Sequence, residues 1–310
     1  MKNNNFLSTI GHTPLIKLAT DTAPAIFAKL EMMNPTLSIK DRIVEYMINA
    51  AEKRGVLKKG ATIIEASSGN TGASLAMMGA LKNYPVIITT TTKTSSEKIA
   101  MMKLYGATVH ICDADLTEES PNHYITLAKQ LASTMPNAYF LNQYNNSDNP
   151  DAHYHTTGPE IWMQTEGQID YLVATGSTGG TISGAGRFLK EKNKNIKVIL
   201  ADPVGSCYFS YFKAGKINQS EVKPYQVEGA GKNQLCRCMD FSQIDDVIAF
   251  TDQQAFETVN KLALKEGIFA GGSSGGALFV AKVLAANQKN PANIVVILPD
   301  SGIKYSYLLR

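Results

Sequence analysis

The stretch TIIEASSGNTGASLAMMGAL, residues 62–81, decides the fold class. It begins with a β-branched run, continues through a segment rich in glycine and hydroxyl groups, and ends in an apolar pattern typical of a helix. Similar β-branched runs recur along the chain, and helical patterns separate most of them. Parallel neighbouring strands need crossover connections, so this alternation predicts an α/β fold with parallel sheets. The expected strands are Thr62 to Glu65, Pro85 to Thr92, Thr108 to Cys112, Tyr139 to Asn142, Tyr171 to Thr175, Lys197 to Ala201, Val247 to Thr251 and Ile294 to Leu298.

Composition excludes several classes of protein. The 310 residues suffice for roughly two domains with a large core, and a loop-like stretch at 145–151 favours two sheet modules. The 30 basic and 27 acidic residues form no run that would follow a nucleic-acid backbone, so no nucleic-acid partner is expected. The sequence shows neither a signal-peptide core nor a run of about 18 apolar residues. We expect a soluble, cytoplasmic protein without a membrane partner.

The cysteines give no sign of a disulfide framework or a zinc finger. Cys112, Cys207, Cys236 and Cys238 are too few and are wrongly spaced for either, so we expect reduced thiols. The Cys-x-Cys pair at 236 and 238 leaves a redox or metal role open. It lacks a clustered histidine or a second cysteine pair, and we therefore expect no metal site.

Three segments rich in glycine and hydroxyl groups are candidate anion sites. They are SSGNTG at residues 67–72, GSTGGT at 176–181 and GGSSGG at 271–276. We expect each to follow a strand and open a helix, the third from about Ala277, because helix N-termini bind anions through backbone N–H groups. Together they indicate a ligand with several anionic groups. Taken singly, each segment is explained as well by glycine in a tight turn.

Lys40 lies in NPTLSIKDR, residues 34–42, at the start of an expected amphipathic helix that runs to about Lys53. The helix dipole disfavours a cation in the first turn, so this lysine loses its proton more easily, which suits a Schiff-base nucleophile. An exposed lysine on a helix face is the alternative when the segment is taken alone. The three candidate anion sites favour the first interpretation.

The motifs occur in an order that resembles the cysteine synthase and cystathionine β-synthase family. This family belongs to fold-type II of the pyridoxal-phosphate enzymes, which also includes the tryptophan synthase β subunit. The resemblance implies two parallel-sheet domains with helices on both faces. We expect a larger cofactor-binding domain at 1–36 and 147–310 and a smaller mobile domain at 37–146. The matching segments are IGHTPL at 10–15, NPTLSIKDR at 34–42, SGNTG at 68–72, SEK at 96–98, NQY at 142–144, HTTGPEI at 155–161, TGGT at 178–181, GGSSG at 271–275 and LPDS at 298–301.

The resemblance implies a role for each matching residue. Lys40 would hold pyridoxal 5'-phosphate as a Schiff base and, once released, act as general base for the α-proton of the substrate. Asn70 would bind the phenolic oxygen of the cofactor, and Ser273 would face its pyridine nitrogen. The residues implied to bind the phosphate are Ser177, Thr178, Gly179, Gly180 and Thr181. Those implied to bind the substrate are Ser67, Ser68, Thr71 and Gln143 for the carboxylate and, at the entrance, Gly229 and Lys232.

A serine opposite the pyridine nitrogen has a chemical consequence. Unlike an aspartate, Ser273 does not hold the nitrogen protonated, so the cofactor withdraws electrons less strongly. A weaker electron sink suits elimination of a β-substituent over transamination. We therefore expect β-replacement on an O-activated serine or serine itself, as in cysteine synthases, which make cysteine from O-acetylserine and sulfide.

Departures from the family pattern bear on the substrates. Ser177 replaces a glycine, as in the branch that couples phosphoserine to glutamate for a siderophore precursor. Residues 228–235 keep Gly229-x-Gly231 but lack the aromatic residue and Ile-Pro that usually follow. The tyrosine at position 144 looks more like the pattern of cystathionine β-synthases than like that of plain cysteine synthases. A cation at Lys232 favours a carboxylate-bearing nucleophile over sulfide, and the alternative is a solvated lysine on a mobile loop.

Several functions stay open. Sulfide is the default nucleophile, with cysteine, homocysteine, an amine such as glutamate, or water in a deamination as alternatives. The leaving group is also open. A catalytically silent binding module is a different class, but the intact Lys40 and glycine segments argue against it. A nicotinamide-dependent dehydrogenase is not expected, because no GxGxxG with an acidic residue about 20 positions later follows the first strand. The family implies a small amino-acid substrate and a homodimer.

Overall fold

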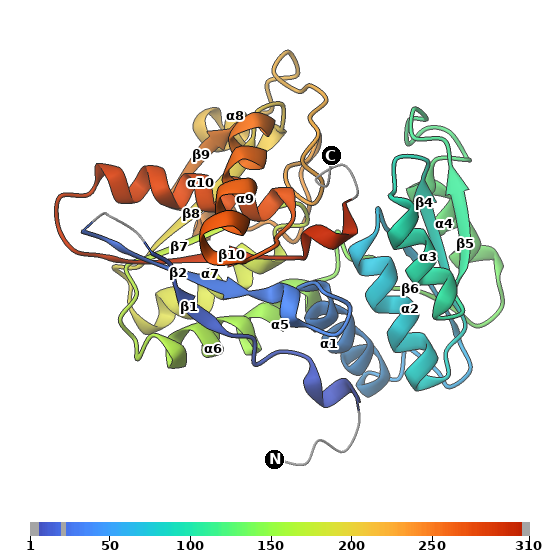
Figure 1. Cartoon of the computed structure of the whole chain (residues 1–310). Coiled ribbons are helices and arrows are strands. Elements are labelled where there is room, and N and C mark those ends of the chain that lie inside the picture. Colours follow the sequence, from blue (N-terminus) through green and yellow to red (C-terminus); the bar gives the residue numbers. More distant parts are fainter. Residues whose placement is uncertain (1–5, 20–22, 306–310) are drawn as a thin grey trace.

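Two sheets made mainly of parallel strands form the framework of the protein (Figure 1). The computed structural model describes residues 6–19 and 23–305. This architecture confirms the predicted α/β class with two sheets. The larger sheet has the order β1 (Leu15–Lys17), β2 (Ala25–Leu30), β10 (Asn293–Leu298), β7 (Tyr171–Thr175), β8 (Lys197–Pro203) and β9 (Asp246–Phe250). The smaller sheet has the order β5 (Thr108–Cys112), β4 (Val86–Thr91), β3 (Thr62–Ala66) and β6 (Ala138–Phe140).

Eight of these strands were predicted from the sequence, and β1 and β2 were not. β1 has three residues, too few for a periodic pattern. β2 contains Lys29. A lysine usually indicates an exposed position, yet this side chain is completely buried. The two strands pair antiparallel, with Leu15 opposite Lys29, because the connection between them is too short for a crossover. The larger sheet is therefore mixed.

Helices cover both faces of each sheet (Figure 1). Strands buried in this way are almost continuously apolar, as in the segment LVA of β7. On the larger sheet, α9 (Asp252–Glu266) and α10 (Gly272–Asn287) pack on one face, and α6 (Thr157–Gln164), α7 (Gly180–Lys192) and α8 (Cys207–Ala214) on the other. On the smaller sheet, α1 (Lys40–Lys53), α2 (Asn70–Lys82) and α3 (Ser96–Leu104) pack on one face, and α4 (Tyr124–Thr134) on the other.

The segment at 145–151 is only partly a loop. Its second half begins helix α5 (Asp148–His155), which packs against both α1 and α7. The predicted boundaries of the two domains, at 36/37 and 146/147, stay a prediction. Among the described residues, no helix combines the length and hydrophobicity needed to span a membrane.

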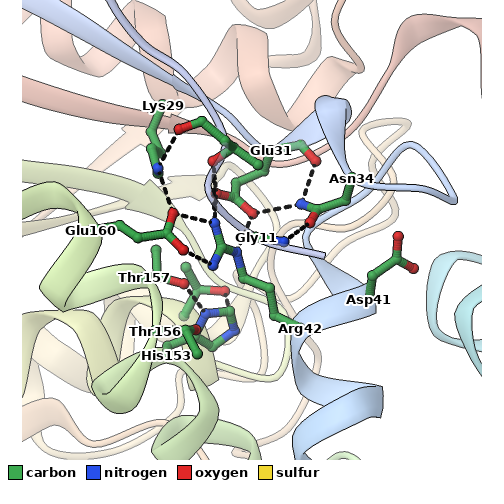
Figure 2. Close-up of polar contacts among 12 residues, drawn as sticks. Gly11, Lys29, Glu31, Asn34, Asp41, Arg42, His153, Thr156, Thr157 and Glu160 are labelled. Carbon is green, nitrogen blue, oxygen red and sulfur yellow. Dashed lines mark hydrogen bonds and ion pairs between the residues drawn. The ribbon is translucent and has the colours of Figure 1, made fainter. Parts of the chain in front are cut away.

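A buried cluster of four charged residues holds the start of α1 against the larger sheet (Figure 2). The Arg42 guanidinium donates to Glu31 at 2.7 and 2.8 Å and to both carboxylate oxygens of Glu160 at 2.7 Å. Lys29 Nζ donates to Glu160 at 2.7 Å. Burial raises the pKa of Glu160, but the hydrogen bonds and charges of Arg42 and Lys29 outweigh this effect and lower it to about 2. Two cations thus balance two carboxylates in the interior.

The cluster determines where Lys40 lies. Arg42 and Lys40 are two positions apart on α1, so their side chains leave the helix in different directions. Arg42 enters the cluster, which leaves Lys40 to face away from it. The backbone N–H of Ile39 also donates to Pro299 O at 2.8 Å, so the helix start is tied to the end of β10.

We predict that Arg42→Leu lowers the free energy of unfolding by about 3–5 kcal/mol, because it leaves Glu31 buried without its main cation. Urea denaturation followed by circular dichroism measures the loss. The control is Lys93→Leu, which removes an exposed pair with Asp115, 74% and 85% exposed. This change should cost less than about 1 kcal/mol. Equal losses in the two variants would contradict the prediction.

Candidate active site

A cleft brings together residues from segments beside both sheets. A smaller hollow adjoins it, shares Lys40, Ser177 and Thr178, and also reaches Gly179 and Thr181. Neither lining includes Gly180 or Lys232. The predicted residues that line the cleft are Lys40, Ser67, Ser68, Asn70, Thr71, Gln143, Ser177, Thr178, Gly229 and Ser273. Other residues that line it are Ile39, Lys98, Tyr144, Glu228, Pro299, Asp300 and Tyr305.

Lys40 is the first residue of α1, as the sequence predicted. Burial lowers the pKa of its ammonium group, and the negative charges of Asp300 and Glu31 oppose this shift only in part. The sequence analysis attributed the easier loss of the proton to the helix dipole. The structure adds desolvation, which depends on the tertiary fold, as the larger cause.

The segment 67–72 turns from β3 into α2, as predicted. Ser67 Oγ accepts hydrogen bonds from the N–H groups of Gly69 and Gly72 at 3.1 and 2.9 Å. A Cβ at Gly69, where φ is +146°, would lie 2.3 Å from a carbon of Lys98. Glycine is thus required at this position by both backbone angle and space.

Thr71 and Gln143 meet at the same end of the cleft. Thr71 Oγ1 donates to Gln143 Oε1 at 2.6 Å, and Gln143 Nε2 donates to Ala66 O at 3.0 Å. The Gln143 side chain also hydrogen-bonds the buried Glu65 carboxyl group. Ser68 is exposed at the mouth of the cleft.

The segment 176–181 turns from β7 into α7, also as predicted. Helix α7 has no side-chain cap at Gly179, so its first N–H groups are suited to an anion. Thr178 Oγ1 accepts from Gly180 N at 3.3 Å and from Asn149 Nδ2 at 3.2 Å. A Cβ at Gly180 would lie 1.9 Å from Asn149 Oδ1, so Asn149 packs directly under the loop.

His153 supports this loop from behind, a role that the sequence analysis did not find. Its Nδ1 lies 2.9 Å from Thr157 Oγ1 (Figure 2). Its Nε2 lies 3.1 Å from Thr181 Oγ1. Burial, together with the charges of Lys40 and Arg42, lowers the pKa of His153 well below its usual value. The ring is therefore neutral and connects two hydroxyl groups.

The third glycine segment departs from the prediction. It follows helix α9 and a short loop, not a strand, and its helix α10 begins at Gly272, not near Ala277. A Cβ at Gly275 would lie 2.1 Å from Ala255 O, and one at Gly276 would lie 2.3 Å from the Phe250 ring. These two glycines therefore serve helix packing. Ser273, 2% exposed, is the member of this segment that lines the cleft.

Asp300 occupies the cleft beside Asn70, and the sequence analysis gave it no role. Asn70 Nδ2 donates to Asp300 Oδ2 at 2.6 Å, and Asn70 Oδ1 accepts from Lys304 Nζ at 2.9 Å. The Tyr305 hydroxyl also donates to Asp300. The available signal was the place of Asp300 just after β10, since the carboxyl ends of parallel strands are where α/β proteins bind ligands.

An ion pair crosses the cleft between Lys98 of α3 and Glu228, with Nζ and Oε2 2.7 Å apart. Lys98 is only 2% exposed, and its Nζ lies 4.0 Å from the centre of the Tyr305 ring. Its sole sequence signal was the family match at 96–98. The pair joins the helix beside the smaller sheet to the segment that carries Gly229.

Lys232 lies behind the wall of the cleft. Its Nζ is 4.3 Å from the centre of the Tyr144 ring, and Tyr144 lines the cleft. Its backbone N–H donates to Ser206 Oγ at 3.1 Å. The role predicted for Lys232 at the entrance stays a prediction.

The cleft fits pyridoxal phosphate in three respects. It offers a lysine of lowered pKa, an uncapped helix end within reach of that lysine, and an uncharged hydroxyl at Ser273. Asn70 has one hydrogen left on Nδ2 to share with a ligand oxygen. The four cysteines are all free and buried, and residues 6–19 and 23–305 hold no group of three His, Cys, Asp or Glu side chains arranged for a metal ion.

Comparison with known proteins agrees with this geometry. Residues 6–300 match the family described as "Pyridoxal-phosphate dependent enzyme". Cystathionine beta-synthase of Apis mellifera is 43% identical over 311 residues, which cover 99% of this chain and 60% of that protein. The chain thus spans well under two thirds of that relative. Cysteine synthase of Buchnera aphidicola is 38% identical over 301 residues, covering 96% of this chain and 94% of that one.

Solved structures show the same fold. A hydrogen sulfide-producing enzyme of Fusobacterium nucleatum superposes with a TM-score of 0.90 at 36% identity, covering 98% of this chain and 100% of the other. O-ureido-L-serine synthase superposes with a TM-score of 0.91 at 30% identity, covering 98% and 94%.

We predict that Gly180→Ala weakens binding of pyridoxal phosphate to the apoprotein by about tenfold or more. The added Cβ displaces Asn149, which supports Thr178, and overpacking of this kind typically costs about 1–3 kcal/mol. Titration followed by cofactor absorbance measures the affinity. The control is Gly60→Ala, where φ is +76° and no atom lies within 4 Å. That variant should lose about 1 kcal/mol of stability through backbone strain but keep its affinity. An unchanged affinity in Gly180→Ala would be the contrary result.

Proposed function

The chain belongs to the pyridoxal-phosphate dependent enzyme family, and we propose that it catalyses β-replacement on a serine-like amino acid. In this reaction a leaving group on the β-carbon is exchanged for a nucleophile. The observation that carries the proposal is the meeting of Lys40, the 67–72 segment and the 176–181 segment at one cleft. Each of the three supplies a different need: an amine, a carboxylate site and a phosphate site.

The cofactor, when bound, supplies an electron sink that makes the α-proton of the substrate acidic. Residues 177–181 hold its phosphate, with the first turn of α7 directed at the negative charge. Lys40 anchors it and then accepts the α-proton at Nζ. The lowered pKa of Lys40 suits this step, because burial favours the neutral amine that takes up the proton.

The substrate carboxylate binds to the 67–72 segment and to Gln143. Backbone N–H groups at the start of α2 and the Ser67 hydroxyl are donors, and Thr71 and Gln143, which hydrogen-bond each other, line the same end of the cleft. Ser273 would face the ring nitrogen as a neutral hydroxyl group, which would keep the electron sink moderate. The Lys98–Glu228 pair closes the cleft above the reacting atoms and limits access of water.

For the substrates we propose O-acetylserine and sulfide, as in cysteine synthases. A second candidate is an amino-acid nucleophile such as homocysteine, cysteine or glutamate. The names of the relatives favour neither, since they include cystathionine beta-synthase, cysteine synthase and O-ureido-L-serine synthase. Serine, O-acetylserine and O-phosphoserine offered in turn with each nucleophile would decide. A catalytically silent binding module, the alternative of another class, would turn over none of them.

We also propose a cytoplasmic homodimer. The proposal rests on the resemblance to the cysteine synthase and cystathionine β-synthase family. Analytical ultracentrifugation of the cofactor-loaded protein tests the oligomeric state.

We predict that the purified protein is yellow and that Lys40→Ala removes both the visible absorbance of the bound lysine adduct and β-replacement turnover, because the variant lacks the amine. Absorbance spectra and product formation from O-acetylserine and sulfide are the measurements. The matched control is Lys53→Ala at the exposed far end of the same helix, which should keep both. Normal turnover in Lys40→Ala would remove this lysine from the mechanism.

We predict that Lys232→Ala raises the Michaelis constant for carboxylate-bearing nucleophiles about fivefold and leaves that for sulfide unchanged. A partly exposed charge pair contributes about 1 kcal/mol, which corresponds to this factor. Steady-state kinetics with sulfide, cysteine, homocysteine and glutamate measure the effect, and Lys232→Arg, which keeps the charge, is the control. A similar change for sulfide and for the amino acids would show that Lys232 plays no part in the choice.

A further inference from the structure

Glu65 is a buried acid directly beneath the carboxylate site, and no step described above uses it. It belongs to β3 and is 0% exposed. Its Oε1 accepts from Ala66 N at 3.0 Å, and its Oε2 accepts from Gln143 N at 3.2 Å. One carboxyl group therefore joins the strand end that leads into the 67–72 segment to the backbone of Gln143.

The same junction is closed from the other side. Gln143 Nε2 donates to Ala66 O at 3.0 Å, and Thr71 Oγ1 donates to Gln143 Oε1 at 2.6 Å. The two parts of the proposed carboxylate site are the 67–72 segment and Gln143. Glu65 connects them through the backbone, and Thr71 connects them through its hydroxyl group. A shift of Gln143 relative to Ala66 would break both connections.

The surroundings of Glu65 disfavour a negative charge. The titratable groups that face it are Tyr139, Tyr144 and Cys238, which are themselves weak acids, with Arg54 placed beyond Tyr139. Burial outweighs the hydrogen bonds from backbone N–H groups and raises the pKa of Glu65 to about 8. The side chain is therefore largely protonated at neutral pH and becomes ionised within an accessible alkaline range.

We propose that Glu65 is a positioning residue of the amino-acid site, which holds Gln143 against the 67–72 segment in its protonated form and repels the substrate carboxylate once ionised. The inference rests on the proposed function, because it takes the ligand to be an amino acid. Binding of the carboxylate and ionisation of Glu65 oppose each other, so affinity falls as pH rises through about 8. Like charges on Glu65 and on the bound carboxylate disfavour each other, and we expect the affinity to change on the order of tenfold.

The test compares wild type and Glu65→Gln, which keeps the size and one acceptor oxygen but cannot ionise. Isothermal titration calorimetry on the cofactor-loaded proteins gives the dissociation constant of L-alanine between pH 7 and pH 9.5. Alanine carries the carboxylate and amine of a substrate but no leaving group. Titration of its amine and of Lys40 affects both proteins alike, so the ratio of their dissociation constants isolates Glu65.

We expect this ratio, wild type over variant, to rise on the order of tenfold from pH 7 to pH 9.5. The matched control is Asp202→Asn. Asp202 is a second buried acid, whose pKa burial raises to about 7, and it does not line the cleft. Its variant should follow the pH dependence of the wild type. A ratio that stays constant for Glu65→Gln would overturn the inference and leave the proposed function intact. Failure of the wild type to bind alanine at any pH would overturn both.

A measurement on the wild type alone covers the case in which Glu65→Gln does not fold. Protein labelled with carbon-13 at the glutamate carboxyl groups should show one resonance that titrates near pH 8. Saturating alanine should move this titration to higher pH, because the coupling is reciprocal. If no glutamate resonance titrates in that range, or if alanine leaves it unmoved, the inference is wrong.

Discussion

The ion cluster around Arg42 is the interaction on which the active site depends. Arg42 is shared by Glu31, which follows β2, and by Glu160 of α6, so one guanidinium ties the start of α1 to two elements of the larger sheet and its helices (Figure 2). Buried ion pairs add little net stability when compared with apolar packing, because desolvation offsets their attraction. Their value here is geometric. The planar guanidinium accepts only one arrangement of its two carboxylates, and that arrangement sets the direction in which Lys40 leaves the helix.

The cleft collects the carboxyl ends of strands from both sheets. β3 leads into the 67–72 segment, β7 into the 176–181 segment, and β10 into Asp300. Contacts between residues far apart in sequence, such as Asn70 with Asp300 and Lys98 with Glu228, join the two sides. Burial in this shared interior lowers the pKa of Lys40 and raises that of Glu65, so in both groups it favours the uncharged form. Burial thus disfavours charge both on an amine and on an acid that lie at or beside the same cleft.

The strand-to-helix turns could be predicted because their causes are local. A β-branched run, then glycine and hydroxyl groups, then an apolar helix specify β3 to α2 and β7 to α7 without help from the rest of the chain. The third glycine segment was interpreted wrongly for a tertiary reason. Gly275 and Gly276 allow α10 to approach Ala255 and Phe250, and a sequence alone does not distinguish glycines that pack from glycines that bind.

The sequence by itself determined the α/β class, the order of the motifs and, through them, the family, and it singled out Lys40 as the candidate Schiff-base lysine. Only the tertiary structure decided which side chains are buried together and what their burial does. A lysine at position 29 suggests an exposed side chain, but Lys29 pairs with Glu160 inside the protein. Nothing in the sequence distinguishes Glu65 from other strand residues, and its contact with the backbone of Gln143, 78 positions later, exists only in the folded chain. Hydrophobic periodicity and turn chemistry depend on residues that are close together in the sequence, so both can be predicted from it. Desolvation and charge pairing depend on neighbours that the chain brings together only when it folds.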